Sequence, residues 1–462
     1  MSAAAVTTRV EPSSSLRLVP ERGLSVLRLG IVVLLFFGPL AFGAVEPWST
    51  FIVESGTGLL FLLWTIQQTR RETLHVTANP LYGPTLAFSI VIILQLALKQ
   101  TANQAATLST AILYIAYGLL SFLTVQSLRQ TNSLKSLGAL VSAYGTSIAI
   151  FAMLQGLTPN GRLYWLRTPR FGGWIYGPYV NHNHYAGLME MLFPVPLAVA
   201  FSARATRENR FLGGLSAMIM ASTILLSGSR GGLAALAAQL VLLGVIFYRR
   251  KRSTPRYAIL ALAALVVGLV LWVGGADLTT RLGTFSREAK LELSGGTRIN
   301  IDRDALRMFV KKPILGWGLG TFGDVYPQYR SFPTNLILDQ AHNDYLQLLV
   351  ETGTVGFLTM LWFLYLVYRT AIIRLRTRAE SADATLAAVA IVGITGILIH
   401  GLVDFNLQIP ANAAWFFVLC ALATLKLTSP AQGTHNHGQP ESSKTMGWQD
   451  SRVNAPLATT PR

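Results

Sequence analysis

The chain has 462 residues, of which 52% are hydrophobic and 13% charged, and its mean hydropathy is +0.45. This composition excludes an ordinary water-soluble fold, because soluble domains carry about 25% charged residues. Lys and Arg exceed Asp and Glu by 38 to 21, a net charge of +17. On a soluble protein that excess would indicate a nucleic-acid partner. In a membrane protein it is read loop by loop, and no nucleic-acid partner is expected.

Apolar segments of membrane-spanning length recur along the chain, since a transmembrane helix needs about 17 to 25 predominantly apolar residues. The segments lie near 24–44, 50–67, 82–98, 106–126, 134–157, 184–202, 211–227, 231–248, 257–274, 354–373, 384–402 and 411–427. They predict an all-α integral membrane protein with about twelve transmembrane helices. The single cysteine, Cys420, lies within the last segment and excludes a disulfide framework.

Basic residues orient these spans, because retained positive charge marks the cytoplasmic side. Clusters such as Arg70 with Arg71, and the run from Arg249 to Arg256, fall on one side of the predicted bundle, with both ends of the chain. Two long connections, 158–183 and 275–353, lie on the opposite side. The predicted parts are a leader, the first nine spans, a large outer loop, three further spans and a disordered tail, at 1–23, 24–274, 275–353, 354–427 and 428–462.

The large outer loop contains a predicted helix over 298–312, capped by Thr297 and ended by Pro313. Its two sides differ in polarity, as in a helix that lies along a membrane surface. The apolar side holds Ile299, Leu306, Phe309 and Val310, and the basic side holds Arg303, Arg307 and Lys311. The glycines of the following segment, 313–322, permit close approach of the backbone to a ligand.

A histidine motif stands in the second half of this loop, at 341–346. In a helix, His342 would share one face with Leu346, Leu349 and Gly353. A neutral imidazole there can accept a proton from an attacking hydroxyl group. A hydrogen-bonding histidine at the start of a helix is the structural alternative.

Arg230 lies in a short turn, Ser227–Gly232, between two predicted spans. An arginine so close to hydrocarbon is costly, so we expect it to face a polar cavity. Its guanidinium group can bind phosphate oxygens bidentately, with flanking glycines that let the backbone come close. Contact with lipid headgroups is the alternative.

Two further polar segments fall on the same side, at 181–184 and 400–406. The spacing of His182 and His184 is compatible with zinc, but no HExxH pattern or cysteine accompanies them and asparagine is a poor zinc ligand. We therefore expect capping and hydrogen bonding at the entrance of a span, with contact to substrate, and no metal site.

Together these segments resemble the O-antigen ligase and polymerase superfamily of bacterial envelope glycosyltransferases, over nearly the whole chain. The strongest match is His342-Asn343, followed after nine residues by Gly353, which is similar to the ligase signature. The supporting matches are Phe42–Trp48, Asn181–His184, Ser229–Gly231, Pro313–Phe322, and His400 with Asp404 and Phe405.

The resemblance implies a GT-C-like fold of twelve spans in the bacterial inner membrane, with the large loop between spans nine and ten in the periplasm. It implies glycan transfer from undecaprenyl pyrophosphate without metal, nucleotide or other cofactor. His342 would be the base that activates an acceptor hydroxyl group, and Arg230 and an early loop arginine would bind pyrophosphate. For that arginine, Arg298 is the first choice and Arg303 the second, although neither is followed four positions later by the leucine of ligases.

We therefore expect a ligase that joins the glycan to a lipid A core in lipopolysaccharide biosynthesis. The alternatives are an O-antigen or exopolysaccharide polymerase that extends a growing glycan, a protein O-oligosaccharyltransferase and, from another class, a secondary transporter. The expected catalytic residues are His342, Arg230 and Arg298. The expected substrate contacts are Arg303, Arg307, Asn343, Asn181, Asn183, His184 and Asp404. The expected partners are the polyprenyl-linked donor, the acceptor and the lipid bilayer.

Overall fold

The computed structural model describes residues 21–70, 76–169, 173–202, 205–249, 295–334, 337–377 and 381–427. Within these ranges the regular elements are helices, and extended pairing is limited to isolated bridges. Six helices are long and apolar enough to cross a membrane by length and composition. The described part of the chain is therefore helical and fits a multi-pass integral membrane protein.

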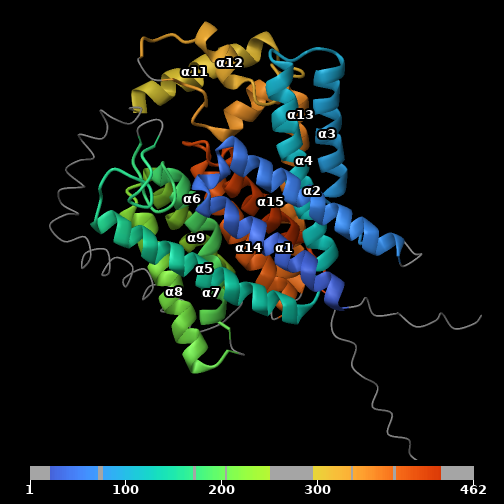
Figure 1. Ribbon diagram of the computed structural model, residues 1–462, viewed down its shortest axis with the longest axis vertical. Helices are drawn as coiled ribbons and strands as arrows, with labels where there is room; N and C mark the ends of the chain where they lie inside the picture. The colour runs from blue at the N-terminus through green and yellow to red at the C-terminus, as the bar shows by residue number, and fades with distance from the viewer. Residues whose placement is uncertain are drawn as a thin grey trace, which may run out of the picture. The chain divides into compact units, whose positions relative to one another are not determined.

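The helices follow one another along the chain as Figure 1 shows. The first half holds α1 (Glu21–Leu40), η1 (Phe42–Ala44), α2 (Pro47–Thr69), α3 (Tyr82–Ala97), α4 (Gln104–Ser127), α5 (Thr131–Leu157), α6 (His182–Leu192), α7 (Pro194–Ala200), α8 (Arg207–Leu226) and α9 (Arg230–Arg249). The second half holds α11 (Gly295–Lys311), α12 (Phe322–Val325), η2 (Tyr326–Gln328), α13 (Asp344–Thr377), α14 (Ala382–His400), η3 (Asn406–Gln408) and α15 (Pro410–Thr424).

The predicted spans within the described ranges fall on helices, with two differences. The sixth is broken into α6 and α7, because Pro194 lacks an N–H group and its ring clashes with the preceding turn. The tenth begins at Asp344, and its backbone leaves the helical conformation at Gly353, with φ 65° and ψ −171°. The predicted span at 257–274, the leader and the tail lie outside the described residues, so the count of about twelve stays a prediction.

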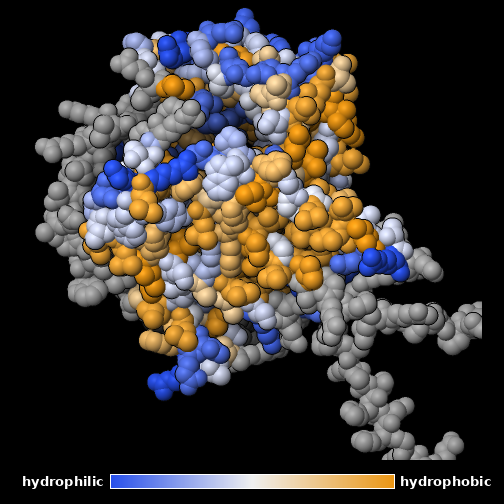
Figure 2. Space-filling view, in the orientation of Figure 1, coloured by the Kyte–Doolittle hydropathy of each residue, from blue (hydrophilic) through white to orange (hydrophobic). Residues whose placement is uncertain are grey.

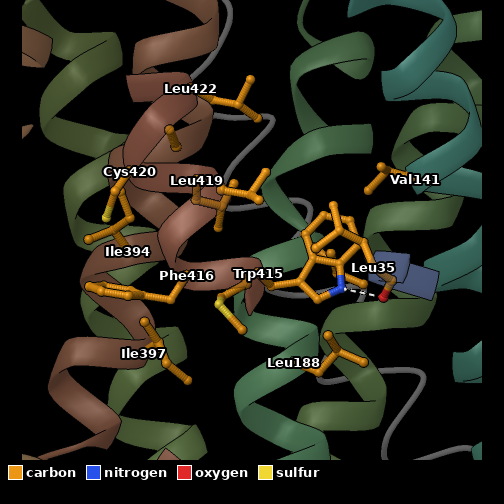
Figure 3. Close-up of a cluster of buried hydrophobic side chains, with 14 of the residues drawn as sticks. Leu35, Val141, Leu188, Ile394, Ile397, Trp415, Phe416, Leu419, Cys420 and Leu422 are labelled. Carbon is orange, nitrogen blue, oxygen red and sulfur yellow. Dashed lines mark hydrogen bonds between the residues drawn. The ribbon is translucent and has the colours of Figure 1, made fainter. Parts of the chain in front are cut away.

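The core of the helical body is built around α6, α14 and α15. Every residue of α6 is buried. Figure 3 shows how side chains of these helices pack, with Leu188 of α6 near Trp415 of α15. The indole of Trp415 donates a hydrogen bond to the carbonyl oxygen of Leu35, at 3.1 Å, and so joins α15 to α1. Polar side chains carried by α6 must therefore find their partners inside the protein.

A second, smaller cluster lies at one end of the helical body, where α11 and α12 pack on the start of α13 (Figure 1). Its buried residues include Ile301, Met308, Phe322, Tyr326 and Val350. Figure 2 shows hydrophobic residues over the helical body and hydrophilic residues at this end and at the opposite one. This distribution is that of a protein with a lipid-facing belt between two aqueous faces.

The loop helix packs on the protein through a third face, between its apolar and basic sides. The residues of α11 that are buried are Ile301, Asp304, Ala305 and Met308, whereas Ile299, Leu306 and Val310 are exposed. The packing face of the helix thus includes the small residue Ala305 and the carboxylate of Asp304. Asp304 can be buried because the backbone N–H and the hydroxyl group of Ser331 donate hydrogen bonds to it, at 2.9 and 3.0 Å. Thr297 lies inside α11, which begins at Gly295, and so does not cap it.

Candidate active site

His342 lies just before α13 and has a left-handed backbone, with φ 53°. The side-chain oxygen of Asn343 accepts hydrogen bonds from the N–H groups of Tyr345 and Leu346, at 3.1 and 3.2 Å, and thereby caps the helix. The expectation that His342 shares a helical face with Leu346 is therefore wrong, because the chain turns before the helix begins. A non-glycine residue in this conformation is strained, and such strain clusters at functional sites.

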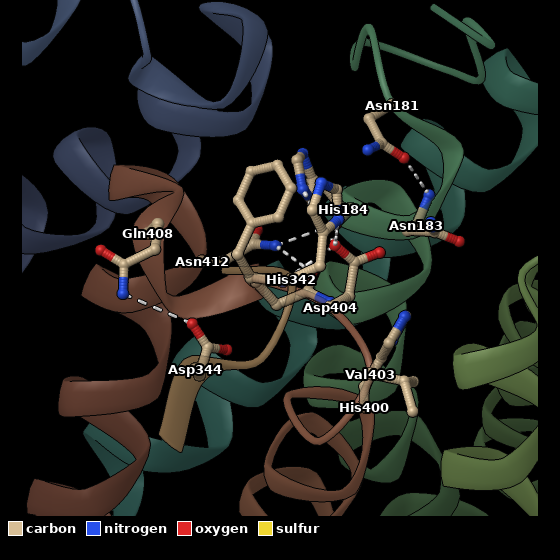
Figure 4. Close-up of polar contacts among 12 residues, drawn as sticks. Asn181, Asn183, His184, His342, Asp344, His400, Val403, Asp404, Gln408 and Asn412 are labelled. Atoms are coloured by element: carbon tan, nitrogen blue, oxygen red, sulfur yellow. Dashed lines mark hydrogen bonds and ion pairs between the residues drawn. The ribbon is translucent and has the colours of Figure 1, made fainter. Parts of the chain in front are cut away.

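The carboxylate of Asp404 lies between two imidazoles (Figure 4). Its Oδ1 atom is 3.7 Å from Nδ1 of His342 and 3.9 Å from Nε2 of His184. The ring of Phe405 meets both imidazoles edge to face, with centroids 4.7 Å away in each case. The side chains of Asp404 and His184 are 2% and 8% exposed, and that of His342 is 18% exposed. His342 is thus the most accessible titratable member of this cluster.

Burial by itself would raise the pKa of Asp404, but contact with His342 and the neighbouring charge of His184 hold the pKa of this carboxyl well below its usual range. The carboxylate is therefore ionised at neutral pH. Facing Nδ1 of His342, it favours a proton on that atom and leaves Nε2 to accept one. Within the described residues, Nδ1 of His342, Nε2 of His184 and Oδ2 of Asp404 are buried without a hydrogen-bond partner, which is unusual outside functional sites.

Arg298 extends from the first turn of α11 to the residue that precedes Asp404. Its Nη1 atom donates to the carbonyl oxygen of Val403 at 2.9 Å. Asp302, one turn further along α11, interacts with both Arg298 and His342, and burial raises its pKa. The structure therefore brings Arg298 to the His342 cluster.

The other two loop arginines point elsewhere. Arg303 is exposed, and the side chain of Arg307 is 57% exposed and pairs with Asp304 on its own helix, at 3.1 Å. Neither makes a contact with His342 or Asp404 in the described part of the chain. Arg298, the first choice from the sequence, is the loop arginine that the geometry favours.

The turn that carries Arg230 packs against the same segment. A Cβ atom at Gly231 would lie 2.7 Å from Nε2 of His400 and 3.0 Å from Cγ2 of Val403. The hydroxyl oxygen of Ser229 is itself 3.2 Å from Nε2 of His400. Val403 is therefore the meeting point of Arg298 and of the turn of Arg230, one residue before Asp404.

The predicted helix-entrance motif has the capping role expected of it. Asn181 precedes α6, and its side-chain oxygen accepts a hydrogen bond from the N–H group of Asn183 at 2.8 Å. Asn183 is buried in the first turn. This cap aims the start of α6, and with it His184, at Asp404 (Figure 4).

The two histidines of this motif point to different places. His182 stacks on Trp174, with ring centroids 4.2 Å apart, and its Nδ1 atom is 2.8 Å from the carbonyl oxygen of Ser227. It thus holds the turn before α9, whereas His184 faces Asp404. Among the described residues no group of three His, Cys, Asp or Glu side chains is arranged to hold a metal ion.

Part of the chain, including three residues of this site, matches a known protein family. Residues 215–361, from within α8 to within α13, match the model of the family described as O-antigen ligase. This match, over about a third of the chain, supports the O-antigen ligase superfamily. The matched region contains Arg230, Arg298 and His342.

A curated relative adds a more distant similarity. The chain is 24% identical over 230 residues to an uncharacterized protein of Haemophilus influenzae, a region that is 45% of this chain and 54% of that protein. The chain thus spans about half the length of the curated relative that it matches.

The glycines of the 313–322 segment serve packing, which corrects the ligand-binding expectation. A Cβ atom at Gly316 would lie 2.5 Å from the backbone of Glu351, and Cβ atoms at Gly318 and Gly320 would meet threonines at or near α4. The carboxylate of Glu351 accepts the N–H group of Gly320 at 2.9 Å. The close approach that these glycines permit is therefore to protein.

Sequence reasoning missed one polar residue at the base of the site. Glu190 of α6 is completely buried, and its Oε1 atom is 2.8 Å from Nδ1 of His400. The sequence does indicate this residue, because Glu190 is a lone carboxylate within the predicted span 184–202. Burying such a group in a membrane is costly, and the residue is usually functional.

Proposed function

We propose that this protein transfers a glycan from undecaprenyl pyrophosphate to a lipid A core acceptor, as a metal-independent ligase of lipopolysaccharide biosynthesis. One observation carries the proposal: His342 faces the ionised Asp404, and Arg298 and the turn of Arg230 both reach Val403 beside it. A base and two cations are thereby placed at one end of the helical body. This is the set of groups that such a transfer requires.

The chemistry follows from the roles of these groups. An acceptor hydroxyl group attacks the anomeric carbon of the donor, and Nε2 of His342 takes its proton. The bond between that carbon and the pyrophosphate oxygen breaks, with inversion, and the electron pair leaves on the pyrophosphate. Arg230 and Arg298 stabilise this negative charge through paired N–H groups. Asp404 orients the imidazole and stabilises the imidazolium ion that forms.

The position of the cluster favours a transferase over a transporter. Figure 2 shows a hollow with hydrophilic residues beside it, at the level between the α11–α12 layer and the helical body. His342 and Arg298 lie at this end and not halfway along the spans, where transporters bind their substrates. We place this end on the periplasmic face of the inner membrane, in agreement with the distribution of basic residues in the sequence.

The acceptor is decided by the envelope glycans of a deletion strain. Loss of all glycan-capped lipopolysaccharide, with polyprenyl-linked glycan accumulating, is the expected result. Loss of long chains alone would assign a polymerase, and loss of a glycoprotein would assign a protein oligosaccharyltransferase. Purified protein that transfers glycan from a polyprenyl-pyrophosphate donor to rough lipopolysaccharide would then establish the reaction, and failure to do so would overturn it.

A further inference from the structure

Below the proposed site, three buried side chains from different helices form a hydrogen-bonded chain. The Nδ1 atom of His400 is 2.8 Å from Oε1 of Glu190, and its Nε2 atom is 3.2 Å from Oγ of Ser229. Glu190 and Ser229 are completely buried, and His400 is 1% exposed. The chain therefore joins α6, the end of α14 and the turn before α9.

The order carboxylate, imidazole, hydroxyl is that of a nucleophilic triad, but access excludes that chemistry. Oγ of Ser229 is buried and also accepts the N–H group of Gly232 at 3.0 Å. No substrate carbon can approach an atom enclosed in this way. The hydroxyl group is instead a structural link within the turn.

The turn that this link holds is the one that presents Arg230. Arg230 stands between Ser229, which bonds to His400, and Gly231, which packs on the His400 ring and on Val403. The carbonyl oxygen of His400 also accepts the N–H group of Val403 at 3.0 Å. His400 therefore contacts the turn of Arg230 through its ring and the segment that leads to Asp404 through its backbone.

A completely buried carboxyl–imidazole pair is costly to desolvate, so it is a poor source of stability, and the geometry that it fixes is the better explanation for it. We infer that Glu190 and His400 are positioning residues that fix the backbone of Arg230 relative to Asp404. The inference rests on the proposed function, in which Arg230 binds the donor pyrophosphate. It predicts that the pair governs donor affinity through Arg230.

The first test measures hydrogen exchange of the amides at 230–233 in purified full-length protein. His400→Gln removes the contact with Glu190, and Ser229→Ala removes the link to the turn. Both are expected to speed exchange there by roughly tenfold, the effect of one lost hydrogen bond. Thr424→Val is the control, because it removes a comparably buried hydrogen bond, from Asn79 at 3.0 Å, in another part of the body. Unchanged exchange at 230–233 in both test variants would overturn the inference.

The second test separates positioning from general destabilisation. His400→Gln should raise the KM for the polyprenyl-linked donor by roughly tenfold, with a much smaller change in kcat. In an Arg230→Ala background the same substitution should have no further effect on that KM, because its effect passes through Arg230. Effects that multiply in the double variant, or that Thr424→Val reproduces, would overturn the inference. Wild-type protein that transfers no glycan would overturn the proposed function, while the exchange measurement still decides whether the pair holds the turn.

Discussion

Nδ1 of His342 lies 3.7 Å from Oδ1 of Asp404, which brings the start of α13 to the end of α14. This contact leaves Nε2 of His342 for the acceptor. We predict that His342→Ala lowers glycan transfer by roughly 10²- to 10⁴-fold, the usual contribution of a general base. The variant should still fold, with a lower melting temperature at neutral pH, because the buried carboxylate of Asp404 loses a partner. A variant that is stable in detergent and still transfers glycan at the wild-type rate would contradict the assignment.

Asp404→Asn tests the carboxylate. A lowered pKa means that the ionised form stabilises the folded state above the ordinary range of aspartate, about 3.9, and that this stabilisation is lost as the pH falls below it. The wild-type melting temperature should therefore fall between roughly pH 5 and pH 3, and the variant should show a flatter profile there. Identical pH profiles for the two proteins would contradict this role.

The arginines differ in their contacts, which gives a matched set of variants. Arg298→Ala should reduce donor affinity by roughly 10- to 100-fold, as expected for lost charged hydrogen bonds. Arg303→Ala and Arg307→Ala, on the same helix and more exposed, should change it by less than about threefold. Arg230→Lys should also be severely impaired, because an ammonium group cannot reproduce a bidentate phosphate contact. Equal effects along α11 would indicate that Arg298 acts only through general charge.

Much of the architecture could be predicted from hydropathy alone, because a membrane span must be a long apolar helix. The helices α2, α4 and α5 lie where the apolar segments placed them. Which face of α11 packs on the protein could not be predicted from hydropathy. Its contact with the loop depends on Asp304 and on Ser331, which is far along the chain, and no local periodicity encodes such a contact.

The residues of the site were predicted one segment at a time, and their convergence was not. His342 and Arg230 stood out as polar groups beside predicted spans. The contact of Arg298 with Val403 depends on how α11 docks, which the sequence pattern does not specify. The left-handed backbone of His342 could not be predicted from the sequence either. A motif beside a predicted helix is assigned to the helix unless its cap is known, and the cap at Asn343 places His342 outside it.

The 313–322 segment gives a test of packing against ligand binding. Gly316→Ala should destabilise the protein by at least about 1–3 kcal/mol, because φ is 71° and the added Cβ atom meets the backbone of Glu351. Gly58→Ala in α2 is the control, since a Cβ atom there meets nothing within 4 Å and alanine favours the helix. Thermal unfolding of both variants would decide the question. A Gly316→Ala protein with wild-type stability and weakened donor binding would restore the ligand-binding interpretation.

The last prediction concerns metal, and it follows from how the donor leaves. Negative charge develops on the departing pyrophosphate, and something positive must stabilise it. Many transferases use a divalent ion held by carboxylates, whereas here Arg230 and the Arg298 guanidinium beside Val403 supply fixed cations.

The outer carboxylates that could serve as ligands are Asp324, Asp339, Asp344 and Asp404. Three of these already accept protein hydrogen bonds: Asp324 from Asn103 at 2.9 Å, Asp344 from the Leu407 N–H group at 3.1 Å and Asp404 from the Phe405 N–H group at 2.8 Å. We predict that the proposed glycan transfer by purified protein continues at full rate in excess EDTA and gains nothing from magnesium or manganese. If chelation stopped turnover and one divalent ion restored it, the arginine mechanism would be wrong, and substitution of those four aspartates would identify the ligands.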